Sequence, residues 1–233
     1  MSQLPKLLVA TTNAGKLAEI TAWLSDLPYE VICLNDLPNV PEAVEETGET
    51  FAANALLKAQ AYYQHTGWLT LSDDSGLTVN ALGGRPGVHS ARYAGAGATD
   101  AQMVAKLLDE MQEVPDDQRQ AQFVCVVALC GTGVAQTFKG SCAGEITRVA
   151  RGANGFGYDP IFLEVAAGKT FAELTQAEKA LLSHRGRALT QVRVFLTKSE
   201  HKRIGQDFQD EDKAGMPMSI DHSRDPANPI NSD

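Results

Sequence analysis

Hydroxyl, amide and amino groups are concentrated in one short segment near the N-terminus, Thr11-Thr12-Asn13-Ala14-Gly15-Lys16. Such side chains, together with backbone N–H groups at the start of a helix, are suited to bind a chain of phosphates. The segment is not a Walker A loop, because the leading glycine and the Gly-Lys-Ser/Thr ending are absent. A polar turn that only caps a helix is an equally good interpretation. Lys58 and Arg92 are further candidates for neutralising phosphate, although a helix surface and a loop also explain them.

Carboxylates occur as two adjacent pairs, Asp73 with Asp74 and Glu45 with Glu46. Carboxylates from separate loops can hold Mg²⁺ beside substrate phosphates, and one of them can accept a proton from an attacking water. The alternative is turn chemistry, since Asp-Ser-Gly favours turns by itself. If Asp73 and Asp74 continue the preceding strand, their side chains point to opposite faces of the sheet. Only one of them is then expected to enter the site.

Two later segments could bind a base. In Gly155-Phe156-Gly157-Tyr158-Asp159-Pro160 the glycines let the backbone bend close to a ligand, and the Phe156 ring stays available for stacking. Lys179 and Ser183-His184-Arg185 can donate hydrogen bonds to a carbonyl on a base edge. The alternatives are a phenylalanine buried in a glycine-rich connection and solvated charges on helix surfaces.

Alternating strands and helices must position these segments. Buried or alternating apolar runs predict five strands, at 6–10, 30–34, 68–71, 123–130 and 134–138. The third strand is expected to end in the Ser72–Gly76 segment. Helical spacing and capping residues predict helices after Lys16, over about 49–63, after Thr99, after Thr175 and after Ser183. The alternation predicts an α/β protein, and the hairpin near 123–138 makes its sheet mixed.

The composition excludes several classes of protein. The formal net charge is −9 and no large basic cluster occurs, so we expect no nucleic-acid partner and a small phosphate-bearing substrate. No apolar run approaches the roughly 20 residues of a membrane helix, and no signal peptide precedes the first strand, so we expect no membrane partner and a cytoplasmic location. The four cysteines form neither a C-x-x-C pair nor a zinc set. Residues 1–200 are predicted to form one folded domain, and the polar residues 201–233 a disordered C-terminal tail.

At these segments the chain resembles the inosine triphosphate pyrophosphatase family, the non-standard purine NTP pyrophosphatases. The resemblance covers roughly Leu7 to Leu196, and its motifs agree in order and spacing. These motifs are Thr11-x-Asn13-x-x-Lys16, Glu45-Glu46-Thr47-Gly48, Asn54-Ala55 with Lys58, Ser72-Asp73-Asp74-Ser75-Gly76-Leu77, Gly87–Tyr93, Gly155–Pro160 and Ser183-His184-Arg185-Gly186. The resemblance implies an α/β fold with a mixed β-sheet and flanking helices, two lobes around a central substrate cleft, and a homodimer.

The resemblance also implies an activity and roles for individual residues. The activity is Mg²⁺-dependent hydrolysis of ITP, dITP and XTP to the nucleoside monophosphate and pyrophosphate. Asp74 would be the proton acceptor and a metal ligand, Glu45 a second carboxylate at the metal, and Ser75 a substrate contact. The triphosphate would be held by Thr11, Thr12, Asn13, Ala14, Gly15, Lys16 and Lys58. The base pocket would be formed by Phe156, Gly157, Tyr158, Asp159, Lys179, His184 and Arg185.

The chain departs from the family pattern at two places, and two alternative functions stay open. Many relatives have glutamate where this chain has Ala53, close to the expected metal, and the tail beyond Lys198 is longer than the family core requires. The first alternative is a related pyrophosphatase for pyrimidine or modified nucleotides. The second is a nucleotide-binding regulator without turnover.

Overall fold

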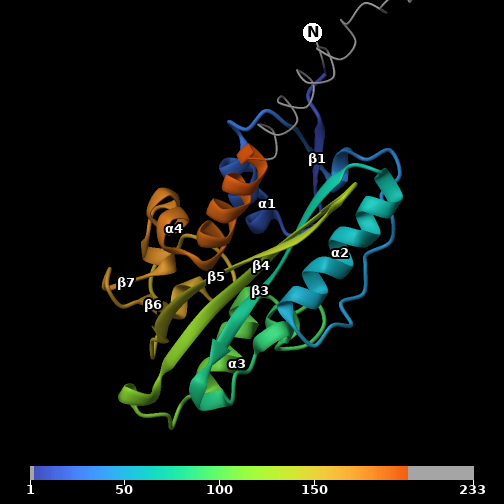
Figure 1. The fold of residues 1–233 in the computed structure, drawn as a ribbon. Coiled ribbons are helices and arrows are strands. Elements are labelled where there is room, and N and C mark those ends of the chain that lie inside the picture. The colour runs from blue at the N-terminus through green and yellow to red at the C-terminus, as the bar shows by residue number, and fades with distance from the viewer. Residues whose placement is uncertain (1–2, 199–233) are drawn as a thin grey trace, which may run out of the picture. The chain divides into compact units, whose positions relative to one another are not determined.

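The computed structural model describes residues 3–198 of the 233-residue chain. Met1–Phe195 form one compact unit, shown with its strands and helices in Figure 1. Of the second unit, Leu196–Asp233, residues 196–198 are described and are helical. The tail predicted at 201–233 lies outside the described residues.

One sheet of seven strands forms the centre of the first unit, in the order β2-β1-β3-β4-β5-β6-β7. β1 runs parallel to β2 and β3, whereas every later pairing is antiparallel, so the predicted mixed sheet is confirmed. The strands are β1 Lys6–Val9, β2 Glu30–Cys33, β3 Leu69–Val79, β4 Gln120–Gly131, β5 Val134–Ile146, β6 Phe162–Glu164 and β7 Lys169–Thr170.

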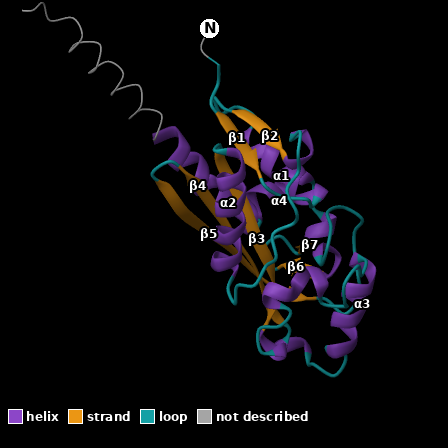
Figure 2. Cartoon of the chain, turned by 90° about the vertical axis from the view of Figure 1, so that its right-hand side faces the viewer, coloured by secondary structure: helices purple, strands orange, loops and turns teal. Residues whose placement is uncertain are grey.

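Helices cover both faces of this sheet. They are α1 Ala14–Leu24, α2 Phe51–Thr66, α3 Asp100–Glu110, α4 Gln176–Leu182 and an unlabelled helix that begins at His184. Short 3-10 helices cover Leu34–Asp36, Asn80–Leu82, Gly87–Arg92, Asp116–Gln118, Asp159–Ile161 and Phe171–Glu173. In Figure 1, α2 lies on one side of the long strands, and α4 and the unlabelled helix lie on the other. Figure 2 shows α3 at the opposite end of this unit from β1 and β2.

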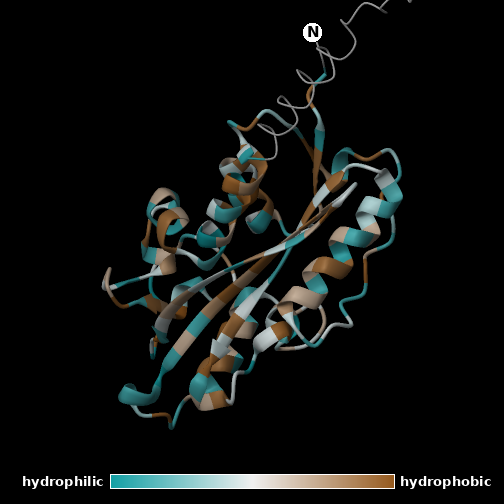
Figure 3. Cartoon of the chain, viewed as in Figure 1, coloured by the Kyte–Doolittle hydropathy of each residue, from teal (hydrophilic) through white to brown (hydrophobic). Residues whose placement is uncertain are grey.

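Apolar side chains from the helices fill the space against the sheet. Ala55 and Ala59 of α2 pack against Val126 and Ala128 of β4, and Figure 3 shows hydrophobic residues along both elements. At the other end Met103, Leu107 and Met111 are buried with Phe123 and Phe162. The described cysteines are free thiols, and Cys125, Cys130 and Cys142 are buried as small apolar residues.

The third strand is longer than the sequence predicts. β3 continues through Ser72–Gly76 to Val79, and β4 pairs with it from Thr70 to Val79. The alternative of a turn at Asp-Ser-Gly is therefore wrong, because pairing with a central strand outweighs local turn preference. Gly76 serves close packing instead, since a Cβ there would lie 2.4 Å from Ser90 Oγ.

Candidate active site

The polar segment after β1 forms the start of α1, and we call residues 11–16 the phosphate loop. Asn13 is the N-cap of α1, and its side chain accepts a hydrogen bond from the Lys16 N–H at 2.9 Å. A Cβ on Gly15 would lie 2.4 Å from the ring of Phe156, so the loop packs directly against that ring. The absence of a side chain at position 15 therefore allows the phosphate loop to pack closely against Phe156.

The carboxylate of Asp73 points toward α1 and the helix that begins at His184. Its Oδ2 atom lies 3.1 Å from Lys16 Nζ and 3.3 Å from Arg185 Nη2. Burial alone would raise the pKa of Asp73, but Lys16, then Arg185 and Lys58, hold it below its ordinary value. Asp73 is therefore a charged carboxylate between two cations.

Asp74 points to the opposite side of the sheet, toward α2. Its Oδ2 accepts a hydrogen bond from Asn54 Nδ2 at 3.0 Å, and its Oδ1 accepts one from the Ser75 N–H at 2.9 Å. Burial raises the pKa of Asp74, and Glu46 raises it further, while Lys58 opposes this most strongly. A carboxylate with a raised pKa is better suited to accept a proton than an exposed aspartate.

The acidic loop brings Glu46 to Lys58 of α2, and the charge of Glu46 acts on Asp74. Lys58 Nζ donates to Glu46 Oε1 at 2.5 Å and to the main-chain oxygen of Asp73 at 2.8 Å. Arg92 lies at 4.0 Å from Glu46. Glu45, the residue expected beside the metal, has an exposed side chain, whereas its neighbour Glu46 is the glutamate that contacts Lys58.

The oxygen atoms of Asp74 and Glu46 suit a hard cation. Within residues 3–198 no group of three or more histidine, cysteine, aspartate or glutamate side chains is close enough to hold a metal alone. Mg²⁺ does not need such a cage, since it is usually bound by one or two carboxylates, several waters and substrate phosphates. The two carboxylates beside Lys58 therefore fit a magnesium ion that arrives with a phosphate ligand.

A cavity of about 290 Å³ opens next to the phosphate loop. It is lined by Lys16, Ser75, Phe156, Asp159, His184 and Arg185, among others. Phe156 lies between cations, with Lys179 Nζ 4.6 Å and Arg185 Cζ 5.6 Å from the centre of its ring. An aromatic ring with cations at its face can stack a planar base and neutralise an anion.

The basic residues of this cavity are buried rather than solvated. Lys179, His184 and Arg185 are 6, 4 and 2% exposed, which excludes the helix-surface alternative for them. Lys179 Nζ donates to Asp159 Oδ2 at 2.5 Å, and burial raises the pKa of Asp159 despite this partner. Buried charges need such partners.

His184 has an unused hydrogen-bonding atom at the cavity. Its ring stacks on Phe123, with centroids 4.6 Å apart, and Nδ1 has no hydrogen-bond partner among the described residues. Burial, then the nearby Arg185 and Lys179, lowers the pKa of His184 well below 6.5. The imidazole is therefore neutral at pH 7, with a free position for a ligand.

The rest of the glycine-rich segment is held by two further contacts. Tyr158 is buried, and its hydroxyl donates to the Ser90 oxygen at 3.0 Å. The Gly157 N–H donates to Asp100 Oδ2 at 2.6 Å. Asp100, at the start of α3, was not expected at the site, because no local pattern links it to residues 155–160.

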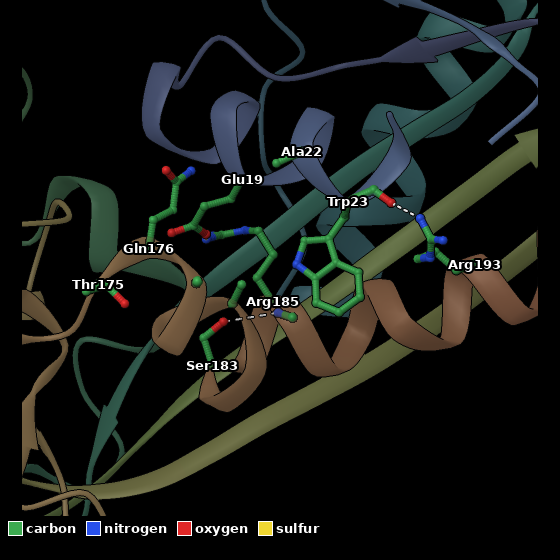
Figure 4. Close-up of a pocket in the computed structure, with 11 residues that line it drawn as sticks. Glu19, Ala22, Trp23, Thr175, Gln176, Ser183, Arg185 and Arg193 are labelled. Carbon is green, nitrogen blue, oxygen red and sulfur yellow. Dashed lines mark hydrogen bonds and ion pairs between the residues drawn. The ribbon is translucent and has the colours of Figure 1, made fainter. Parts of the chain in front are cut away.

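Sequence reasoning also missed Glu19. Its carboxylate lies 2.8 Å from Lys179 Nζ and also binds Arg185. The one available signal was spacing, since Glu19 follows Lys16 by three residues and shares its face of α1. Beyond Glu19 lies a second cavity, of about 590 Å³, shown in Figure 4 with Trp23 and Arg193. It shares Arg185 with the first cavity, but neither the phosphate loop nor a candidate metal ligand lines it.

Comparison with known proteins identifies the family of the chain. A sequence model described as the Ham1 family matches residues 7–195. A "dITP/XTP pyrophosphatase" from Geobacter sulfurreducens is 51% identical over 185 residues, covering 79% of this chain and 92% of the relative. One of the same name from Shigella flexneri is 49% identical over 187 residues, covering 79% and 94%.

Solved structures show the same fold. A HAM1 protein from Coxiella burnetii superposes with a TM-score of 0.77 and 43% identity, covering 84% of this chain and all of that one. The Staphylococcus aureus Ham1 protein has a TM-score of 0.75 and 40% identity, covering 83% and 99%. Within the described residues no helix is long and apolar enough to cross a membrane.

Proposed function

Since the chain belongs to the Ham1 family, we propose that it hydrolyses ITP, dITP and XTP to the nucleoside monophosphate and pyrophosphate. The names of relatives about half identical to it support this activity. One observation carries the proposal. Lys16 of the phosphate loop and Arg185 of the base cavity contact the same oxygen of Asp73, immediately beside Asp74.

Each end of the substrate has a set of groups suited to it. The triphosphate would lie along residues 11–16, with Lys16 and Lys58 neutralising its charge. The base would stack on Phe156 beside Lys179, His184 and Arg185. Ser75 lies between the two ends, because its Oγ accepts from Arg185 Nη2 at 2.9 Å.

In the proposed mechanism Asp74 orients a water molecule and accepts its proton as the water attacks the α-phosphorus. Bound Mg²⁺, held by Asp74 and Glu46, would supply positive charge to the triphosphate. Lys16 and Lys58 would stabilise the charge that develops on the departing pyrophosphate. Positioning and charge stabilisation account for most of the rate enhancement in such transfers.

Base selection would follow from hydrogen-bond polarity. Lys179 and Arg185 can only donate hydrogen bonds, so a base with a 6-keto oxygen satisfies them. Adenine has an amino donor at this position, which would leave buried donors unpaired. The pocket therefore favours hypoxanthine and xanthine over adenine.

We further propose that the enzyme needs Mg²⁺ and acts as a homodimer in the cytoplasm, as the family resemblance implies. Activity after treatment with a chelator, and again after addition of Mg²⁺, tests the first statement. Light scattering during size-exclusion chromatography tests the second.

The function is tested by chromatography of ITP, XTP, dGTP, ATP, dTTP and UTP after incubation with the protein, with and without Mg²⁺. The proposal predicts IMP and pyrophosphate from ITP, and little reaction of ATP. Faster cleavage of dTTP or UTP would favour the pyrimidine alternative. Calorimetric binding of ITP without any product would favour the regulator.

A further inference from the structure

Asp73 connects the two ends of the candidate site through one atom. Oδ2 lies 3.1 Å from Lys16 Nζ, 3.3 Å from Arg185 Nη2 and 3.4 Å from Arg185 Nε. Ser75 Oγ donates to the same oxygen at 3.2 Å and accepts from Arg185 Nη2 at 2.9 Å. A group from the phosphate loop and a group from the base cavity therefore share one carboxylate oxygen.

The environment of Asp73 leaves this carboxylate little freedom. The residue is 1% exposed, and Oδ1 has no hydrogen-bond partner among residues 3–198. A buried carboxylate is stable only while opposite charges and hydrogen bonds replace its lost hydration. Lys16 and Arg185 supply that compensation, so a displacement of either cation changes the force that Asp73 exerts on the other.

Resting on the function proposed above, we infer that Asp73 is a positioning residue that couples recognition of the base to placement of the triphosphate. Asp73 holds the planar guanidinium of Arg185 at a fixed angle to the cavity. A fixed donor cannot turn away from the amino group of adenine, so its rigidity is what rejects ATP. The same carboxylate holds Lys16 where the phosphates of a correctly seated substrate reach it.

This role makes a prediction that a merely structural role does not. If Asp73 only supported the fold, its replacement would lower turnover of ITP and ATP by the same factor. If Asp73 positions Arg185, turnover of ITP falls more than turnover of ATP. The informative quantity is the ratio of kcat/KM for ITP to kcat/KM for ATP, because it cancels a loss of active protein.

The experiment measures this ratio in the full-length protein and in three variants, with circular dichroism as a check of folding. Asp73→Asn keeps the shape and removes the charge, and it should lower the ratio about tenfold or more, as loss of charged hydrogen bonds does. Lys16→Ala alters a residue of the phosphate loop, yet it should lower the ratio at least about threefold by releasing Asp73. Lys58→Ala is the matched control. Lys58 donates to the main-chain oxygen of Asp73 and acts on its carboxylate through charge alone, so the ratio should change less in Lys58→Ala than in Lys16→Ala.

The outcomes separate this inference from the proposed function. A native enzyme that forms no IMP and pyrophosphate from ITP refutes the function. If the native enzyme is active, a folded Asp73→Asn variant with an unchanged ratio overturns the positioning role and leaves the function intact. An unchanged ratio in Lys16→Ala overturns the coupling, because Asp73 would then act on Arg185 alone. If Asp73→Asn does not fold, the ITP-to-ATP ratio of Lys16→Ala is compared with that of Lys58→Ala. A lower ratio in Lys16→Ala supports the coupling, and equal ratios overturn it.

Discussion

Asn54 donates its side-chain amide to Asp74 Oδ2 at 3.0 Å and accepts the Gly48 N–H with its oxygen at 2.7 Å. One side chain of α2 therefore fixes both the candidate proton acceptor and the end of the acidic loop. Asn54 is 1% exposed, so water does not compete for these bonds. The orientation of Asp74 is thus set by neutral donors, Asn54 and the Ser75 N–H.

Replacing Asp74 with asparagine removes the group that accepts the proton. We expect kcat for ITP to fall by about 10³ or more, the upper part of the range for general base catalysis. The variant should keep its circular dichroism spectrum, because asparagine has the same shape. Asp116→Asn is the control, since Asp116 forms an exposed ion pair with Arg148. Retained turnover in Asp74→Asn would refute the assignment.

Asn54→Ala should leave Asp74 in place but free to rotate. We expect a decrease in kcat of about 10–100-fold, typical for loss of a group that orients a metal ligand. The loss of two hydrogen bonds, one buried and one partly buried, should also lower the free energy of unfolding by about 1–3 kcal/mol. Steady-state kinetics and urea unfolding measure the two effects. An unchanged kcat in a destabilised protein would mean that Asn54 only supports the fold.

The difference between Asp73 and Asp74 shows how far sequence reasoning reaches. Alternation along a strand predicts that their side chains point to opposite faces, and the contacts with Arg185 and Asn54 agree. Which face holds the base cavity depends on where α1 and α2 pack, and no local pattern encodes that. The length of β3 was missed for the same reason, since its pairing partner β4 lies about 50 residues later.

The predicted segments do lie together around the cavity, but the contacts of individual residues within them could not be predicted. Thr11–Lys16, Phe156 and Arg185 come from distant parts of the chain and line one region. Glu45 and Glu46 are adjacent and chemically identical, so only the fold decides which one reaches Lys58. The burial of Lys179 and Arg185 could not be predicted from the sequence either, because their partner Glu19 comes from α1, far away in the chain.

Phe156→Ala removes the surface on which the base would stack. We expect KM for ITP to rise about tenfold or more, from base–aromatic stacking of about 1–3 kcal/mol, with a smaller change in kcat. Phe138→Ala is the control, because Phe138 packs against Phe195 and does not line the cavity. Initial rates over a range of ITP concentrations measure both constants. An unchanged KM in Phe156→Ala would place the base elsewhere.

The neutral state of His184 makes stability depend on pH. Burial keeps its pKa well below 6.5 in the folded chain, whereas the unfolded chain takes up a proton near 6.5. The unfolded state therefore binds more protons below pH 6.5. This contribution to stability is complete above pH 6.5 and decreases as the pH falls toward the lower, folded value.

His184→Gln should remove that dependence. Between pH 6.5 and 5.5 the free energy of unfolding of the native protein should fall more steeply than that of the variant, by up to about 1.4 kcal/mol per pH unit. Urea unfolding at several pH values measures this difference. His65→Gln is the control, because His65 is exposed on α2. Parallel curves for the native protein and His184→Gln would show that folding does not lower the pKa of His184.

The most direct test of the account is hydrolysis of ITP in water enriched in oxygen-18, followed by mass spectrometry of both products. Attack on the α-phosphorus by a water that Asp74 activates predicts one labelled oxygen in IMP and none in pyrophosphate. Label in pyrophosphate, or release of IDP and labelled orthophosphate, would contradict the proposed reaction.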